Sequence, residues 1–160
     1  MKNKLLIFIV SIGVSLCSCD NQNRYIKQSK RKENIKKEHV TTLLNTLQTG
    51  KTESLNTIVN SDKYIQHNLM AADGLEGLKS FISILPREST KVEIKRIFQD
   101  KDYVFTHVQY DIFGPKIGFD VFRFENYKIV EHWDNLQNIA PLNPSGHSMI
   151  DGTTKLKRFR

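Results

Sequence analysis

The chain has 160 residues, with 24 Lys and Arg against 17 Asp and Glu, which gives a formal net charge of +7. This length fits one ordinary domain with a single core. The positive charge belongs to the two ends, because residues 38–154 hold eleven basic and fifteen acidic residues, a net charge of −4. A nucleic-acid-binding domain would carry its positive charge on the folded surface. The charge distribution therefore argues against nucleic acid as a partner.

The first nineteen residues predict a lipoprotein-type signal peptide. A short basic start precedes an uncharged apolar stretch, Leu5 to Leu16, which is too short for a comfortable membrane span. The following "LCSC" resembles the lipobox of bacterial lipoproteins, with Leu16 at −3 and Ser18 at −1 before Cys19. Cys17 fits less well, because the bulky Leu16 would then stand at −1. The alternative is an ordinary secretory signal with two incidental cysteines.

An acylated Cys19 would anchor the protein in a membrane of the bacterial cell envelope, on the extracytoplasmic side. No cysteine follows it, so the mature domain has neither a disulfide nor a cysteine nucleophile. Residues 20–32 are polar, basic and without periodicity, which predicts a flexible tether near anionic lipid headgroups. We expect the folded domain over residues 33–152 and a basic tail over residues 153–160.

Three helices are expected at the start of this domain. The first begins at Glu33 and ends near Gly50, and the second is the short stretch "TESLNTIV". The third begins after Asp73, which forms a capping-box pattern with Glu76, and ends at Pro86. Tyr64 to Asn68 would then form the connection that leads into the third helix.

After Pro86 the apolar period changes from that of a helix to two, which predicts β-strands. The expected strands are residues 91–99, 103–113, 118–125 and 127–137. Helices followed by an antiparallel meander indicate an α+β domain, with the helices on one face of a curved sheet.

Strand alternation defines the candidate site. Asp120 shares a face with Phe122 and Phe124, His132 shares a face with Asp134, and His107 shares a face with Phe105. A carboxylate beside imidazoles in a cavity of low polarity could take and return a proton. The alternative is that Asp120 and His132 pair across strands at a solvated sheet edge.

Other chemistries find less support. The dispersed histidines match no short metal-ligand spacing, so no metal site is predicted, and a zinc site remains possible only through the fold. No Gly-rich phosphate loop, Walker motif or Ser nucleophile elbow is present, which argues against a nucleotide enzyme. Trp133 could line a pocket, although a large aromatic residue on a strand more often belongs to the core.

The segments "YIQHN…DGLEGLKSF", "FDVFRFENYKIVEHWDNLQ" and "GHSMIDG" together resemble the SnoaL-like proteins of the nuclear transport factor 2-like superfamily. Within it they resemble the branch described as predicted aldol-condensation enzymes. The resemblance covers residues 33–152. It implies a cone-shaped α+β half-barrel around one deep pocket, commonly a homodimer formed through the sheet. In its polyketide-cyclase members, an aspartate acts as acid and base on a carbonyl substrate without metal or organic cofactor.

The resemblance implies roles for individual residues. Asp120 would be the proton carrier, and His107 and His132 would orient it. The residues expected to shape the pocket are Tyr64, His67, Asn68, Phe105, Phe122, Trp133 and Asp134. Two functions stay open at this point. One is a cofactor-independent cyclase, aldol-type enzyme or isomerase for a small carbonyl compound. The other is a non-catalytic, lipid-anchored protein that binds a small apolar molecule.

Overall fold

The computed structural model describes residues 14–154, and its contacts divide the chain into two units between Glu33 and Asn34. Residues 1–13 of the predicted signal peptide and residues 155–160 of the basic tail lie outside the described residues. Among the helices of residues 14–154, none has the length and apolar character needed to cross a membrane. The lipidation of Cys19 stays a prediction.

The segment predicted as a flexible tether is helical. Helix α1 runs from Val14 to Thr49 and includes all of residues 20–32. The prediction of irregular structure is wrong because polarity removes a core without removing helix propensity. The segment has no Gly or Pro, and Lys, Arg and Gln favour helices. The side chains of residues 21–29 are exposed, as their polarity predicts.

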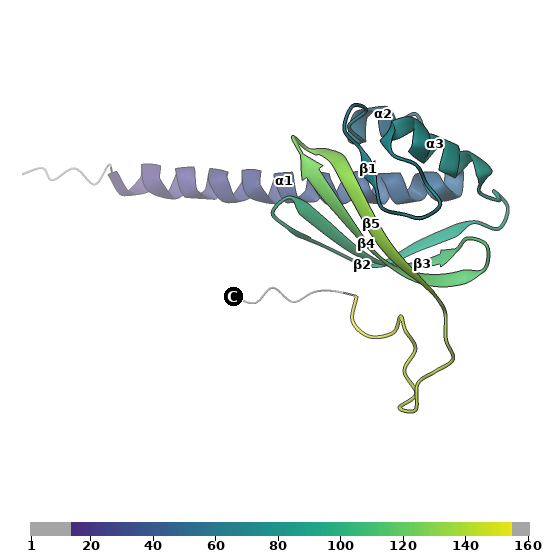
Figure 1. Cartoon of the computed structure of the whole chain (residues 1–160). Coiled ribbons are helices and arrows are strands. Elements are labelled where there is room, and N and C mark those ends of the chain that lie inside the picture. Colours follow the sequence, from purple (N-terminus) through teal and green to yellow (C-terminus); the bar gives the residue numbers. More distant parts are fainter. Residues whose placement is uncertain (1–13, 155–160) are drawn as a thin grey trace, which may run out of the picture. The chain divides into compact units, whose positions relative to one another are not determined.

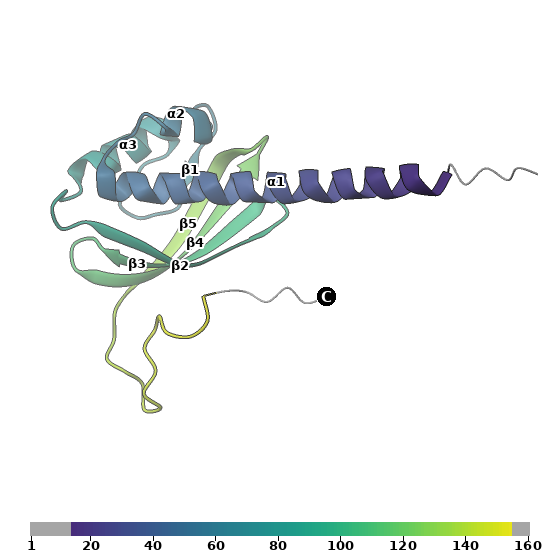
Figure 2. The same cartoon turned by 180° about the vertical axis from the view of Figure 1, so that it is seen from behind.

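The second unit contains the remaining elements, and the predicted α+β class is confirmed. Its helices are α2 (Leu55–Ile58) and α3 (Gly74–Ile84). Its strands are β1 (Ile65–Gln66), β2 (Lys91–Asp100), β3 (Tyr103–Asp111), β4 (Pro115–Glu125) and β5 (Lys128–Asn138). They form one sheet in the order β1-β5-β4-β3-β2, shown in Figures 1 and 2.

The sheet is mixed, whereas an antiparallel one was predicted. Strand β1 runs parallel to β5, with Ile65 opposite Glu131 and Gln66 opposite His132, and the other neighbours are antiparallel. A two-residue strand has too few positions to show alternation, so the sequence indicated only a connection here.

The core lies between the helices and one face of the sheet, which is called the inner face below. From residue 34 onward α1 contributes buried apolar residues at helical spacing, and α3 contributes a second set. Figure 1 shows both helices on the same side of the strands. The helical core residues are Val40, Leu43, Leu44, Leu47, Leu75, Leu78 and Ile82. The strand core residues include Val104, Val108, Phe122, Phe124 and Ile129.

A buried lysine ties α1 to the sheet. The ammonium of Lys36 donates to Asp102 Oδ1 at 2.7 Å and to the carbonyl oxygen of Lys101 at 2.8 Å. Lys36 is only 8% exposed, so these two acceptors replace the water that the ammonium loses on burial. The contact fixes α1 against the turn between β2 and β3.

The chain after β5 is held on the other face of the sheet, called the outer face below. Arg96 of β2 donates Nη2–H to the carbonyl of Asp151 at 2.5 Å and Nε–H to the carbonyl of Thr153 at 2.8 Å. Arg96 pairs with His107 in the register of β2 and β3. This guanidinium therefore fixes the C-terminal segment to the outer face.

Candidate active site

The strand register brings the predicted carboxylate and imidazole to the inner face. Asp120 of β4 lies opposite Asp134 of β5, and Phe122 lies opposite His132. Because side chains two positions apart share a face, Asp120, His132 and Asp134 point to the same side of the sheet. Asp120 is 2% exposed and His132 is 8% exposed. The expectation that these two groups share a largely dry space is confirmed.

Two hydroxyl groups from β3 hold Asp120. Thr106 donates to Oδ2 at 2.8 Å, and the Tyr110 hydroxyl lies 2.9 Å from both carboxylate oxygens. Tyr110 reaches this position across Gly118, where an added Cβ would stand 2.8 Å from the Tyr110 ring. Neither donor was predicted from the sequence. Alternation along β3 shows that Thr106 and Tyr110 point to the same side of their strand. Only the strand register shows that this is also the side to which Asp120 points.

Gln66 fixes the tautomer of His132. The backbone N–H of Asn68 donates to Gln66 Oε1 at 3.0 Å, which identifies this atom as the amide oxygen. The same oxygen lies 2.8 Å from His132 Nδ1. An amide oxygen only accepts, so Nδ1 must carry a proton and donate it.

One further proton is then needed between His132 and Asp120. His132 Nε2 lies 3.4 Å from Asp120 Oδ1. With Nδ1 protonated, a neutral imidazole would turn the Nε2 lone pair toward a carboxylate oxygen, which is repulsive. The contact is attractive only when His132 is an imidazolium or Asp120 is a carboxylic acid. The pair therefore shares one proton.

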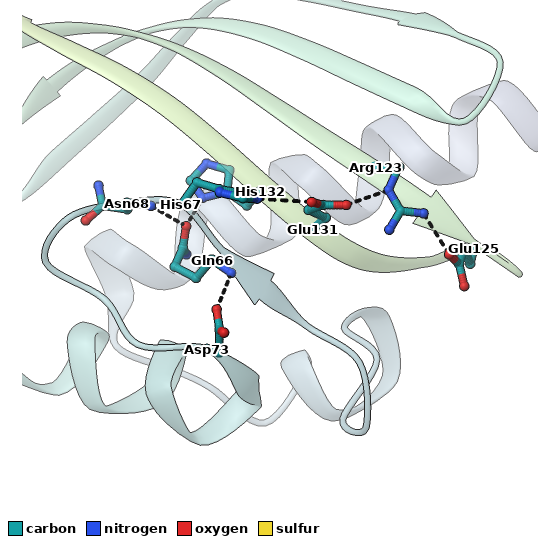
Figure 3. Close-up of polar contacts among 8 residues, drawn as sticks. All are labelled: Gln66, His67, Asn68, Asp73, Arg123, Glu125, Glu131 and His132. Atoms are coloured by element: carbon teal, nitrogen blue, oxygen red, sulfur yellow. Dashed lines mark hydrogen bonds and ion pairs between the residues drawn. The ribbon is translucent and has the colours of Figure 1, made fainter.

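The segment Tyr64 to Asn68 is a connection built around Gln66. Its amide Nε2–H donates to the Tyr64 hydroxyl at 3.0 Å. Its backbone N–H donates to Asp73 Oδ1 at 2.7 Å (Figure 3). Asp73 is the residue that precedes α3, as the capping-box pattern predicts, but its carboxylate makes no bond to the helix. It accepts from Gln66 instead, and so positions the residue that orients His132.

A pocket opens above these residues. Its cavity volume is about 80 Å³, and its mouth opens to solvent. The polar lining residues are Tyr64, Gln66, Asn68, Tyr110, Lys116, Asp120, His132 and Asp134. The apolar lining residues are Leu43, Leu44, Leu47, Met70, Ala71, Leu78, Phe81, Ile112, Phe113 and Leu136. A small set of polar groups at one place in an apolar hollow is typical of a small-molecule site.

The two carboxylates of the pocket act on its two buried tyrosine hydroxyls. Burial, followed by the charge of Asp134, raises the pKa of the Tyr64 hydroxyl far above its usual value. Burial and the charge of Asp120 raise the pKa of the Tyr110 hydroxyl in the same way. Both tyrosines therefore stay protonated and keep their donor hydrogens at any physiological pH.

His107 does not belong to this site. It is 7% exposed, but it lies on the outer face, where it pairs with Phe119 of β4 and stacks on that ring at 4.4 Å. Its Nδ1 accepts from Arg96 Nη1 at 2.9 Å. Burial and the neighbouring Arg96 and Lys95 lower its pKa. The prediction that His107 orients Asp120 is wrong, because the two residues occupy opposite faces of the sheet.

Two predicted pocket aromatics lie elsewhere. Phe105 is on the outer face and stacks on Phe98 with ring centroids 5.0 Å apart. Phe122 is fully buried in the core and is not among the pocket-lining residues. Its ring stacks on that of His132 with centroids 4.5 Å apart, so it packs against one face of the imidazole.

His67 and Trp133 also lie on the outer face. Because Gln66 ends β1 opposite His132, the residue that follows it points to the opposite side. The His67 ring stacks on Trp133 with ring centroids 4.9 Å apart. Its Nε2 lies 3.0 Å from Glu131 Oε1 (Figure 3). Burial raises the pKa of Glu131, but hydrogen bonds from His67 and Arg123 outweigh burial and hold this pKa below its usual value. These contacts are structural, and they correct the prediction of a pocket role.

Tyr64, Asn68 and Asp134 are pocket-lining residues, as predicted. Asn68 Nδ2–H donates to Asp134 Oδ2 at 2.5 Å. Three possible metal-ligand atoms, one from each of Asp120, His132 and Asp134, lie within 4.8 Å of one another. This spacing could hold a metal ion. The hydroxyls of Thr106 and Tyr110 already donate to the carboxylate oxygens of Asp120, so a metal ion would have to displace these hydrogen bonds.

Comparisons with known proteins identify the fold. No protein-family model matches the chain, and no curated protein matches its sequence. Among solved structures, an NTF-2 like protein of unknown function from Burkholderia xenovorans gives a TM-score of 0.58 at 16% identity, covering 70% of this chain and 90% of that one. An epoxide hydrolase from Mycobacterium tuberculosis gives 0.54 at 17% identity, covering 66% and 84%.

A third structure matches the resemblance seen in the sequence. It is a proposed SnoaL-like polyketide cyclase from Jannaschia sp., with a TM-score of 0.54 at 16% identity, covering 65% of this chain and 86% of that one. At these identities the agreement concerns the arrangement of the backbone. The expectation drawn from the sequence segments is confirmed: this chain has the nuclear transport factor 2-like fold that the SnoaL-like proteins share.

Proposed function

We propose that this protein is a cofactor-independent acid/base enzyme that acts on a small carbonyl compound in the pocket. The observation that carries the proposal is the contact between His132 Nε2 and Asp120 Oδ1, which lie 3.4 Å apart at the wall of an apolar hollow. The likeness to an epoxide hydrolase and to proposed polyketide cyclases supports an enzyme on this fold.

The pair has the two partners that enolisation requires. As a carbonyl oxygen approaches, the imidazolium of His132 donates its Nε2 proton to that oxygen. Asp120 Oδ1 takes the proton from the carbon beside the carbonyl, so the pair gains one proton as it loses one. The substrate leaves as an enol, or its nucleophilic carbon attacks a second carbonyl in a cyclase or aldol reaction. Gln66 keeps Nδ1 protonated throughout.

Proton exchange tests the proposal without knowledge of the natural substrate. Phenylacetaldehyde, cyclohexanone and 4-phenyl-2-butanone would be incubated with the protein in D2O, and the loss of α-proton signals followed by ¹H NMR. We expect faster exchange than in buffer for at least one of them. Asp120→Asn and His132→Gln should each slow it by about 10²–10⁴-fold. Asp100→Asn, an exposed carboxylate at the end of β2, is the matched control.

Folding of each variant is checked by its urea unfolding transition. Exchange no faster than in buffer for the whole panel would overturn the enzyme proposal. So would full activity in folded Asp120→Asn.

A second candidate function is the binding of a small apolar ligand without turnover. It is favoured by the three donors around Asp120, because a carboxylate held by Thr106, Tyr110 and His132 is also a stable structural group. Tight binding of apolar carbonyl compounds without any α-proton exchange would support this function over the first.

The envelope location and the homodimer stay predictions. Partly exposed aromatic residues on the outer face, Phe98, Tyr103 and Phe119, would suit a dimer formed through the sheet.

A further inference from the structure

Asp134 is the one carboxylate of the pocket that the proposed mechanism does not use. It lines the pocket beside Asp120 and His132. Among residues 14–154, its only hydrogen-bond donor is the Asn68 side chain, at Oδ2. A carboxylate can accept about four hydrogen bonds, so most of the accepting positions of Asp134 have no donor from the described residues.

Within the part of the chain that the structure describes, no positive side chain forms an ion pair with Asp134. None of the ion pairs formed by the described residues includes it. Lys116 is the only Lys or Arg among the pocket-lining residues, and its ammonium donates to Asn138 Oδ1 at 2.8 Å. Asp134 is half-buried, so pairing with a cation of the ligand would offset the water that its carboxylate loses when the pocket is filled.

The charges close to Asp134 lead to the same point. With one proton between them, His132 and Asp120 together carry no net charge, so Asp134 adds one negative charge beside them. The positive charge of Lys116 lies four residues away from Asp120 along β4, opposite Asn138. Burial, and after it the charge of Asp134, raises the pKa of the Tyr64 hydroxyl, which therefore resists becoming an anion there. An anionic ligand would meet the same repulsion, and a cationic ligand would be attracted.

We propose that the ligand of this pocket carries a protonated amine that pairs with Asp134, on an otherwise apolar body. The apolar body packs against leucine and phenylalanine side chains of α1 and α3, among them Leu43, Leu47 and Phe81. The amine donates to the open positions of the Asp134 carboxylate.

An amine at Asp134 and a carbonyl group at Asp120 and His132 together define a substrate class, which rests on the proposed function. The acceptor and donor atoms of Asp120, His132 and Asp134 lie within 4.8 Å of one another. With C–C bonds of about 1.5 Å, an amine and a carbonyl oxygen reach both groups when about one or two carbons separate them. The geometry points to amino ketones or amino aldehydes with an apolar substituent.

Binding of matched probes tests the amine directly. Hexylamine, hexan-1-ol and hexanoate share one apolar body and differ only in the charge of the polar end. Their affinities would be measured at pH 7 and low salt by NMR titration, following the His132 ring signals. We expect hexylamine to bind at least about tenfold more tightly than hexan-1-ol, and hexanoate to bind more weakly than hexan-1-ol.

Asp134→Asn removes the charge and keeps an oxygen for Asn68. It should reduce hexylamine affinity by about tenfold and leave hexan-1-ol within about threefold. Asp100→Asn, on the exposed end of β2, should change neither. Equal affinities of the amine and the alcohol for the wild-type protein would overturn the proposal. An unchanged preference in Asp134→Asn would do so as well.

A divalent metal is the competing occupant, because the same three residues could ligate one. Titration with Zn²⁺ alone separates the two. Micromolar Zn²⁺ binding that is lost in both His132→Gln and Asp134→Asn would assign the open carboxylate to a metal and overturn the amine. The amine preference and the α-proton exchange fail independently: binding without exchange refutes only the enzyme, and exchange without a charge preference refutes only the amine.

Discussion

The hydroxyl of Tyr110 offers a quantitative test of the site. Tyr110 is 4% exposed, and its hydroxyl lies 2.9 Å from both oxygens of Asp120. Tyr110→Phe removes this one donor and keeps the ring that packs across Gly118. A hydrogen bond to a charged group contributes about 1.5–3 kcal/mol, and the carboxylate left behind is almost completely buried.

We therefore expect Tyr110→Phe to lower the free energy of unfolding by about 2 kcal/mol. With a urea m value of about 1–3 kcal/mol/M, the unfolding midpoint should fall by about 1 M. The assay is urea unfolding followed by circular dichroism at pH 7, which also reports whether the m value is unchanged.

Tyr103→Phe is the matched control, because that tyrosine is 39% exposed on the outer face. Its effect should stay within about 0.5 kcal/mol. A Tyr110→Phe variant as stable as Tyr103→Phe would show that the hydroxyl does not stabilise Asp120, and would refute the description of this carboxylate as a charge held by β3.

Two further predictions concern the outer face and the membrane. The lowered pKa of His107 means that, below pH 6.5, the unfolded chain binds more protons, so the free energy of unfolding falls with acidification. His107→Asn keeps an acceptor for Arg96 and should weaken this dependence in urea unfolding at pH 5, 6 and 7; equal slopes for both proteins would contradict it. Cys19→Ala should move the protein from the membrane fraction to the soluble fraction, and a variant that stays with the membrane would refute lipid anchoring.

Much of the fold could be predicted from local patterns. The third helix and the four long strands appear near their expected positions, because each has enough residues to show a period of 3.6 or two. The helix over residues 20–32 was missed for a different reason. The side chains of residues 21–29 are exposed and show no apolar period, so only the propensity of the residues favours a helix.

The sequence by itself determined which residues share a face within one strand. It placed His132 with Asp134 on β5 and Asp120 with Phe122 on β4, because successive side chains point to opposite sides. It could not determine which face of β3 joins them. Shifting a strand by one residue exchanges its two faces, so the choice between His107 and the pair Thr106 and Tyr110 depends on the register.

Only the tertiary structure decided that register and brought Gln66 to His132. Burial of Val104 and Val108 against the helices turns Thr106 and Tyr110 inward with them, and leaves His107 on the outer face. Strand β1 pairs with β5 across a separation of 66 residues, which no local pattern reports. The proton shared by His132 and Asp120 thus depends on contacts between segments that are distant in the chain, because backbone pairing and burial fix them together.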